Sequence, residues 1–276
     1  MLCSDSTKMT IVPTEALVES NGNISWAWAS LMIQLLEVGT KEVSPAIVII
    51  SDFDESGPRE IPAIRGAVDR ALAKHGERSV DTVANTIFPN ALWDPSAPDG
   101  AARLYERYER VWPRIQLDPA NRKGVYFRRL TAFRPATGAG DPVNQLERML
   151  DAYRKSRGRR SALQAGLFDP TADHRGEPFL GFPCLQQIAF APTRNNGLSM
   201  TAFYAVQYQF AKAYGNYLGL CRLGRFVAHE LGRHLTKMTC VASVATLGDT
   251  TKSSLAELQR DLRSAVPDHA DQGGDS

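Results

Sequence analysis

The sequence predicts an α+β fold, on three observations. Strand-like and helix-like segments follow one another without the regular alternation that a doubly wound parallel sheet shows. Apolar residues recur at helical spacing between Asn23 and Glu37. The β-branched run from Ala46 to Ile50 is typical of a buried strand. We therefore expect a mixed sheet with packed helices in a single domain.

Periodicity and the positions of Pro and Gly predict the remaining elements. The expected helices cover residues 23–37, 64–74, 79–88, 101–112, 143–154, 201–220, 222–234 and 255–266. The expected strands cover residues 46–50, 161–168, 184–191 and 238–247. Pro113 is expected to stop the helix at Trp112, since proline breaks the helical hydrogen bonding. We expect a loose N-terminal segment over 1–22, one domain over 23–266 and a polar tail over 267–276.

Composition narrows the possible partners and the compartment. The 276 residues carry 32 Lys plus Arg against 30 Asp plus Glu, a formal charge of +2, so a nucleic-acid partner is not expected. The apolar stretches are too short or too interrupted to span a bilayer, so no membrane association is expected. The four cysteines are widely spaced without a CxxC pair, and the start of the chain has no signal-peptide pattern. These features predict a reduced, cytoplasmic protein.

Common catalytic and metal-binding motifs are missing from the sequence. The stretch from His229 to His234 resembles a zinc motif, but its two histidines are five positions apart and do not share a helix face. We interpret it as part of an ordinary amphipathic helix and expect no metal site. The sequence contains no phosphate-binding GxxxxGK[ST] or GxGxxG loop and no GxSxG nucleophile turn.

A proline directly precedes one of the cysteines, in the stretch Gly181-Phe182-Pro183-Cys184. The fixed backbone of proline holds the thiol at a defined strand edge. A single cysteine is more often a small buried apolar residue than a nucleophile. The significance of Cys184 therefore depends on the segments around it.

Seven segments occur in the order found in one enzyme family. In chain order they are Gly124-Val125-Tyr126, Asn144-Gln145-Leu146, Arg159-Arg160, Phe168-Asp169-Pro170, Pro183-Cys184, Leu198-Ser199 and Asn216. Together they resemble the thymidylate synthases and the related pyrimidine nucleotide C5-hydroxymethylases. The resemblance is firmest over residues 123–247. It implies the mixed sheet of that family and a homodimer formed through the sheet.

The resemblance also implies a chemistry and a role for each site residue. Cys184 takes the position of the nucleophile that adds to C6 of a pyrimidine nucleotide, and Tyr126 that of a tyrosine that helps to move protons at C5. Arg159 and Arg160 would bind phosphate in the site of the partner subunit. Asn216 would read the base, with an amide that suits uracil.

The remaining implications concern the substrate-binding residues and the one-carbon donor. Ser199 and Gln187 also fall among the substrate-binding positions. The implied one-carbon donor is 5,10-methylenetetrahydrofolate, and no metal is implied. An ordinary structural role is open for each of these residues: Tyr126 in the core, Asn216 as a helix cap or turn, and the arginine pair as helix-end charge.

The sequence departs from the family at positions that contact phosphate, ribose and folate. Leu185 follows the cysteine where the family has histidine, and Ala205 stands in place of an arginine. Tyr208 replaces an aspartate that contacts folate, and Ser243 and Ala245 fall where a His-x-Tyr pair holds the ribose. Two hypotheses follow. The chain is either a one-carbon transferase acting at pyrimidine C5, by methylation or hydroxymethylation, or a non-catalytic nucleotide-binding, structural or regulatory homologue.

Overall fold

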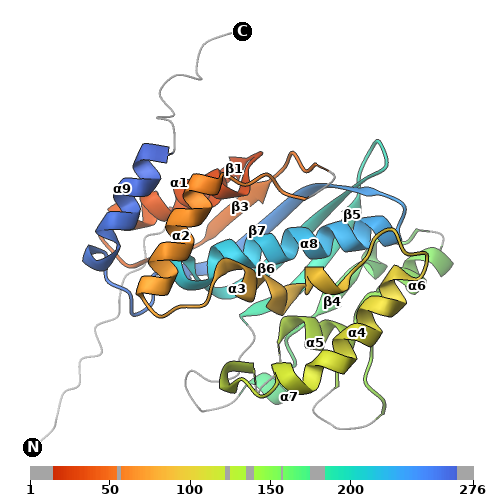
Figure 1. The fold of residues 1–276 in the computed structure, drawn as a ribbon. Helices are drawn as coiled ribbons and strands as arrows, with labels where there is room; N and C mark the ends of the chain where they lie inside the picture. The colour runs from red at the N-terminus through yellow and green to blue at the C-terminus, as the bar shows by residue number, and fades with distance from the viewer. Residues whose placement is uncertain are drawn as a thin grey trace, which may run out of the picture.

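A computed structural model describes residues 15–54, 57–121, 125–134, 140–156, 158–174 and 184–265 of the chain. Within this part, seven strands form one mixed sheet, and nine α-helices complete a single α+β domain (Figure 1). The predicted fold class is thereby confirmed. The long helices α1 and α8 run across one face of the sheet, and the main hydrophobic core lies between them and the strands.

The bounds of the elements are as follows. The strands are β1 Leu17–Asn21, β2 Glu42–Val43, β3 Ala46–Ile50, β4 Gln164–Gly166, β5 Leu185–Pro192, β6 Gly197–Tyr208 and β7 His234–Thr246. The helices are α1 Ile24–Glu37, α2 Pro62–Lys74, α3 Val80–Ile87, α4 Gly100–Ile115, α5 Tyr126–Thr131, α6 Gln145–Lys155, α7 Pro170–Asp173, α8 Tyr214–Glu230 and α9 Ala256–Ala265.

The sheet runs in the order β1-β3-β7-β6-β5-β4, with β2 paired to the end of β7. The pairs β1–β3 and β6–β7 are parallel, and the other pairs are antiparallel. Parallel neighbours require a crossover connection, and α8 provides it between β6 and β7. A π-helical turn, Gln209–Ala213, joins β6 to α8.

Helix α8 lies unusually close to α3 because glycines face that helix. A methyl group on Gly219 would lie 2.7 Å from the carbonyl oxygen of Ala84 and 2.9 Å from Cβ of Ile87. One on Gly215 would lie 2.6 Å from Cβ of Val83. These distances are shorter than a methyl group tolerates, so the packing of the two helices requires glycine, which has no side chain, at these positions.

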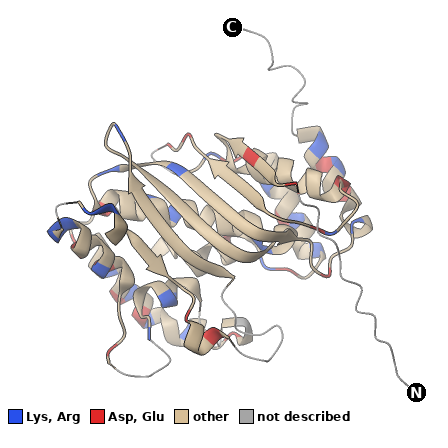
Figure 2. Ribbon diagram, turned by 180° about the vertical axis from the view of Figure 1, so that it is seen from behind, with Lys and Arg blue, Asp and Glu red and all other residues tan. Residues whose placement is uncertain are grey.

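The face of the sheet opposite α1 and α8 is uncovered by any described element (Figure 2). The register aligns Val18, Ile47, Val241, Phe203 and Gln187 in one row across five strands. The row contains no charge, and Figure 2 shows these strands almost free of charged residues. Phe203 is 43% exposed and Val18 is 56% exposed. In a sheet with one face open to water, the strand residues that point to the open face are usually polar. This face is therefore unusually apolar for one in contact with water.

The predicted helix over 201–220 is wrong in its first half. Strand β6 extends to Tyr208, and its residues alternate between buried Met200, Ala202 and Tyr204 and exposed Thr201 and Phe203. This two-residue period indicates a strand. The prediction missed it because an aromatic stretch without Pro or Gly is compatible with both a helix and a strand. The second predicted helix, over 222–234, is the continuation of α8, which ends at Glu230.

Several predicted boundaries also shift. Helix α4 continues through Pro113 to Ile115, since a proline in the last turn costs few helical hydrogen bonds. The strand expected over 161–168 is reduced to β4, because residues 160–162 form a 3-10 turn. The segment 17–21, which the sequence analysis assigned to a loose N-terminal segment, forms β1.

Replacing a glycine at the α3–α8 contact tests this packing. We expect Gly219→Ala to lower the free energy of unfolding by about 2 kcal/mol, because its methyl group meets backbone atoms of α3 that cannot move away. Gly66→Ala in α2 is the matched control, since its nearest atom is the flexible end of Arg70 at 3.4 Å. It should raise stability by roughly 0.5–1 kcal/mol through helix propensity. Chemical denaturation measures both, and equal stabilisation by the two changes would contradict the close contact.

Candidate functional site

Cys184 lies directly before β5, beside the neighbouring strand β6. Its backbone carbonyl accepts a hydrogen bond of 2.9 Å from the N–H of Ala205. The side chain is half-buried, and burial raises the pKa of the thiol above its ordinary value. Among the described residues, no cation lowers this pKa. The thiol is therefore predominantly neutral at pH 7, unlike the activated thiolates of many cysteine enzymes.

Tyr126, the first residue of α5, packs against Cys184. Its hydroxyl oxygen interacts with the backbone N–H groups of Cys184 and Leu185. Burial raises the pKa of Tyr126, so the hydroxyl stays protonated at neutral pH. The structure thus brings together the two residues that the sequence analysis assigned to catalysis. Tyr126 begins a helix, and Gly124 and Pro183, which belong to the segments that carry the resemblance, lie outside the described residues.

A third side chain at this position was not predicted from the sequence. Tyr204 on β6 stands opposite Leu185 in the register and is completely buried. Its ring meets that of Tyr126 edge-on, with centroids 6.4 Å apart and an interplanar angle of 83°. Tyr204 also interacts electrostatically with Cys184. The alternation of buried residues along β6 would have placed Tyr204 beside the cysteine, but the sequence analysis expected a helix there.

A hydrogen-bonded group behind these side chains connects β6 to α8. The Tyr217 hydroxyl donates to Oε1 of Gln207 over 3.0 Å, and Nε2 of Gln207 lies 3.6 Å from Sγ of Cys240. Gln207 is 2% exposed and Tyr217 is 1% exposed. Buried polar groups that bond one another fix the relative position of the elements that carry them.

Asn216, the expected base-reading residue, is the third residue of α8 and directly precedes Tyr217. It is 4% exposed. Its helical phase is that of Leu223 and Glu230, seven and fourteen positions further on. The Glu230 carboxylate lies 4.0 Å from the guanidinium of Arg154, so at its C-terminal end this side of α8 faces α6.

Arg129 of α5 is a cation near Tyr126, but a carboxylate already binds it. Its guanidinium donates to both carboxylate oxygens of Asp173 over 2.7 and 2.8 Å and to the carbonyl of Leu167 over 2.7 Å. The Asp173 side chain is 3% exposed, and its Oδ2 also accepts from the backbone N–H of Asp169. This pair fixes α5 against α7 and leaves Arg129 engaged rather than available to the thiol.

The other expected site residues lie apart from Cys184 in the single chain. Arg159 and Arg160 are exposed at a 3-10 turn that packs beside the far end of β5. Six residues along a strand, from 184 to 190, correspond to about 20 Å. Ser199 donates to the carbonyl of Ala191 at that same end over 3.2 Å. Gln187 is exposed and donates over 2.8 Å to Gln164 of β4.

One described position of the implied folate site departs from the family. Tyr208, which stands where the family has an aspartate, is 40% exposed and lies against Gly248. A phenol offers no carboxylate to the pterin ring. The C-terminal residues from 266 onward lie outside the described part of the chain.

Neither a cluster of metal-binding side chains nor a membrane-spanning helix occurs among the described residues. These residues contain no cluster of three His, Cys, Asp or Glu side chains that could hold a metal ion. His229 lies in α8 and packs on Trp93, while His234 begins β7, so the single helix expected across this motif is wrong. No helix in the described ranges is long and apolar enough to cross a membrane.

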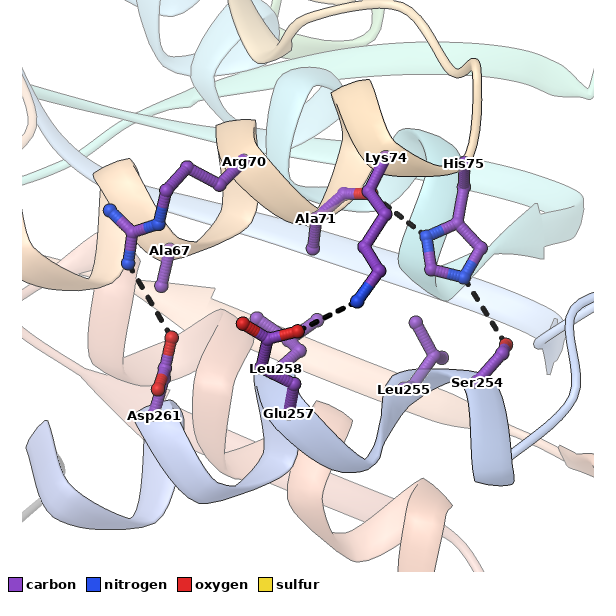
Figure 3. Close-up of a pocket in the computed structure, with 10 residues that line it drawn as sticks. All are labelled: Ala67, Arg70, Ala71, Lys74, His75, Ser254, Leu255, Glu257, Leu258 and Asp261. Atoms are coloured by element: carbon purple, nitrogen blue, oxygen red, sulfur yellow. Dashed lines mark hydrogen bonds and ion pairs between the residues drawn. The ribbon is translucent and has the colours of Figure 1, made fainter.

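A pocket lies between α2 and α9 (Figure 3). Its lining residues do not include Cys184 or Tyr126, and several of them are charged side chains that pair with one another. Lys74 binds Glu257 over 2.8 Å, and Arg70 binds Asp261 over 3.4 Å. His75 and Ser254 close one end through a bond of 3.2 Å. Because its charged side chains already pair with one another, this pocket is a helix contact rather than a candidate catalytic site.

Comparison with known proteins provides no family assignment. No protein-family model matches the chain, and no curated protein matches its sequence significantly.

The raised pKa of Cys184 predicts a steep pH dependence of its reactivity. Since the thiolate is the nucleophile, alkylation by iodoacetamide should accelerate about tenfold per pH unit between pH 7 and 9. It should level off only above the ordinary thiol pKa of 9.0. Peptide mass spectrometry follows Cys184, with buried Cys221 and Cys240 as unreactive internal controls. A plateau below pH 8 would reveal a cation acting on the thiol.

Proposed function

We propose that the chain is a pyrimidine nucleotide C5 one-carbon transferase of the thymidylate-synthase type, acting by methylation or hydroxymethylation through Cys184. The observation that carries the proposal is the meeting of Cys184 with Tyr126 at the start of β5, as the resemblance requires. These two residues are separated by 58 positions in the sequence, counted from 126 to 184. Their contact is independent support, because the sequence order alone does not bring them together.

The chemistry starts with addition of the Cys184 thiolate to C6 of the pyrimidine. The new S–C6 bond moves the C5–C6 electron pair toward O4, which makes C5 nucleophilic. C5 then takes up a proton or a one-carbon unit, the original C5 proton leaves, and expulsion of the thiolate restores the double bond. Tyr126, a protonated hydroxyl beside the thiol, is the group that exchanges protons near C5.

Asn216 is suited to binding a uracil edge. Its amide oxygen accepts from N3–H and its amide nitrogen donates to O4. This amide is 4% exposed, so a ligand that pairs with both of its atoms would be held in one orientation. Tyr208 replaces the folate-contacting carboxylate, so addition to C6 and exchange at C5 are the steps that the named residues of this site support directly. The donor 5,10-methylenetetrahydrofolate remains a proposal from the resemblance.

The proposed active form is a homodimer in which two sheets pack through their open faces. The row from Val18 through Ile47, Val241 and Phe203 is apolar and uncharged, which favours association with an identical face. In such a dimer, Arg159 of the partner subunit and Arg160 of the partner subunit would bind the substrate phosphate. This arrangement explains why both arginines lie far from Cys184 within one chain.

A second candidate function is a non-catalytic homologue that binds a nucleotide or serves a structural or regulatory role. The observation in its favour is that burial raises the pKa of Cys184 without an opposing cation among the described residues. A binding protein does not need a reactive thiol. The two functions differ in whether C6 addition takes place.

Exchange of the C5 proton in D2O distinguishes the two functions. We expect the C5 proton signal of dUMP to disappear in the presence of the protein, faster at pH 9 than at pH 7 because the thiolate fraction rises. UMP, dCMP and CMP identify the base and sugar, and tetrahydrofolate is added or omitted. The control Cys184→Ser should abolish exchange with little change in stability. Exchange that survives in Cys184→Ser contradicts the mechanism, and no exchange with any nucleotide favours the non-catalytic homologue.

A further inference from the structure

One buried hydroxyl beside Cys184 has no hydrogen-bond partner. Oη of Tyr204 is completely buried, and no described residue bonds to it. The two neighbouring tyrosines differ, because Tyr126 meets backbone N–H groups and Tyr217 donates to Gln207. Leaving a buried hydroxyl unpaired is costly, and such groups concentrate at functional sites.

The hydroxyl of Tyr204 differs from the other unpaired polar atoms of the core in its position near Cys184. Those atoms are Trp26 Nε1, Ser30 Oγ, Trp93 Nε1, Tyr105 Oη, Tyr108 Oη and Gln209 Nε2. In the described part of the chain, Tyr204 alone among these residues has a ring contact with Tyr126, the neighbour of Cys184. The hydroxyl and the thiol lie on adjacent, hydrogen-bonded strands, one register position apart. Tyr126 connects the two side chains, since its ring meets that of Tyr204 with centroids 6.4 Å apart and its hydroxyl lies at the backbone of Cys184.

We propose that the Tyr204 hydroxyl donates a hydrogen bond to a carbonyl oxygen of the ligand bound at Cys184. This inference rests on the proposed function, in which the ligand is a pyrimidine base, and it adds a positioning residue to that site. Burial raises the pKa of Tyr204 well above its ordinary value, so the group is a neutral donor. The described groups that act on Tyr204 are tyrosines and cysteines rather than cations, which suits an uncharged carbonyl better than an anionic phosphate.

Tyr204→Phe removes the hydroxyl and keeps the ring, and Tyr217→Phe is the matched control. Because the Tyr204 hydroxyl is unpaired in the free protein, Tyr204→Phe should leave the unfolding equilibrium constant unchanged or lower it. Tyr217→Phe breaks a buried hydrogen bond and should raise that constant about fivefold. Equal destabilisation by the two variants, measured by chemical denaturation, would show that the Tyr204 hydroxyl serves the fold and would overturn the proposal.

Two thiol reagents test the donor role without any nucleotide. Iodoacetamide carries a carbonyl oxygen and methyl iodide does not, and the ratio of their rates at Cys184 cancels changes in the thiol pKa. Tyr204→Phe should lower the ratio of iodoacetamide to methyl iodide about fivefold, whereas Tyr217→Phe should leave it unchanged. An unchanged ratio in Tyr204→Phe overturns the proposal.

Titration with dUMP then separates this inference from the proposed function. If the wild type binds dUMP, Tyr204→Phe should weaken binding about tenfold, the loss expected for one hydrogen bond to a buried donor. Full affinity for dUMP in Tyr204→Phe contradicts the donor role. If the wild type binds none of the pyrimidine nucleotides while the reagent ratio still falls, the proposed function is wrong and the donor role of Tyr204 is upheld.

Discussion

The close packing of α8 between α3 and the sheet is the constraint on which the rest of the structure depends. Gly219 lets α8 approach α3, and Gly224 lets it approach Leu235 of β7, where a methyl group would lie 3.0 Å from Cδ1. The Tyr217–Gln207 hydrogen bond fixes α8 along β6. Helix α8 joins the parallel strands β6 and β7, so its packing fixes the crossover between them. It thereby sets the positions of Asn216 and of the strand end that carries Tyr204.

Charge pairing extends this constraint to the N-terminal half of the chain. Arg65 of α2 binds Glu60, Asp69 and Asp81, with nitrogen–oxygen distances of 3.0, 2.8 and 2.6 Å. These partners raise the pKa of Arg65 further despite its partial burial, and Asp81 also binds Arg222 of α8 over 2.8 Å. Since the guanidinium is 18% exposed, the network is less screened than an ordinary surface pair. It connects α2 and α3 to α8.

Local patterns predicted the elements whose signals are unambiguous. Helix α1 follows its apolar period and begins after the capping side chain of Asn23, and β3 coincides with its β-branched run. The error at β6 arose because an aromatic stretch without Pro or Gly suits both a helix and a strand. The glycines of α8 reduced its helical signal, although they are required by contacts with α3 that lie far away in the sequence.

The residues of the candidate site that follow from the order of motifs could be predicted from the sequence. The residues that join the site through tertiary contacts could not. The position of Cys184 before a strand and the contact of Tyr126 with it agree with the order of motifs. The unpaired hydroxyl of Tyr204 and the Arg129–Asp173 pair depend on neighbours that only the fold supplies. The raised pKa of Cys184 likewise follows from its burial, which the sequence does not display.

The open, apolar sheet face is the feature that connects the single chain to the proposed shared site. The molar mass in solution, measured by sedimentation equilibrium, tests this connection most directly. The account predicts twice the chain mass of 30.3 kDa for the wild type and a single chain for Phe203→Lys, which places a charge at the centre of the face. Leu117→Lys, at an apolar residue 75% exposed outside the sheet, should remain dimeric. A wild type that sediments as one chain at micromolar concentration would contradict the account.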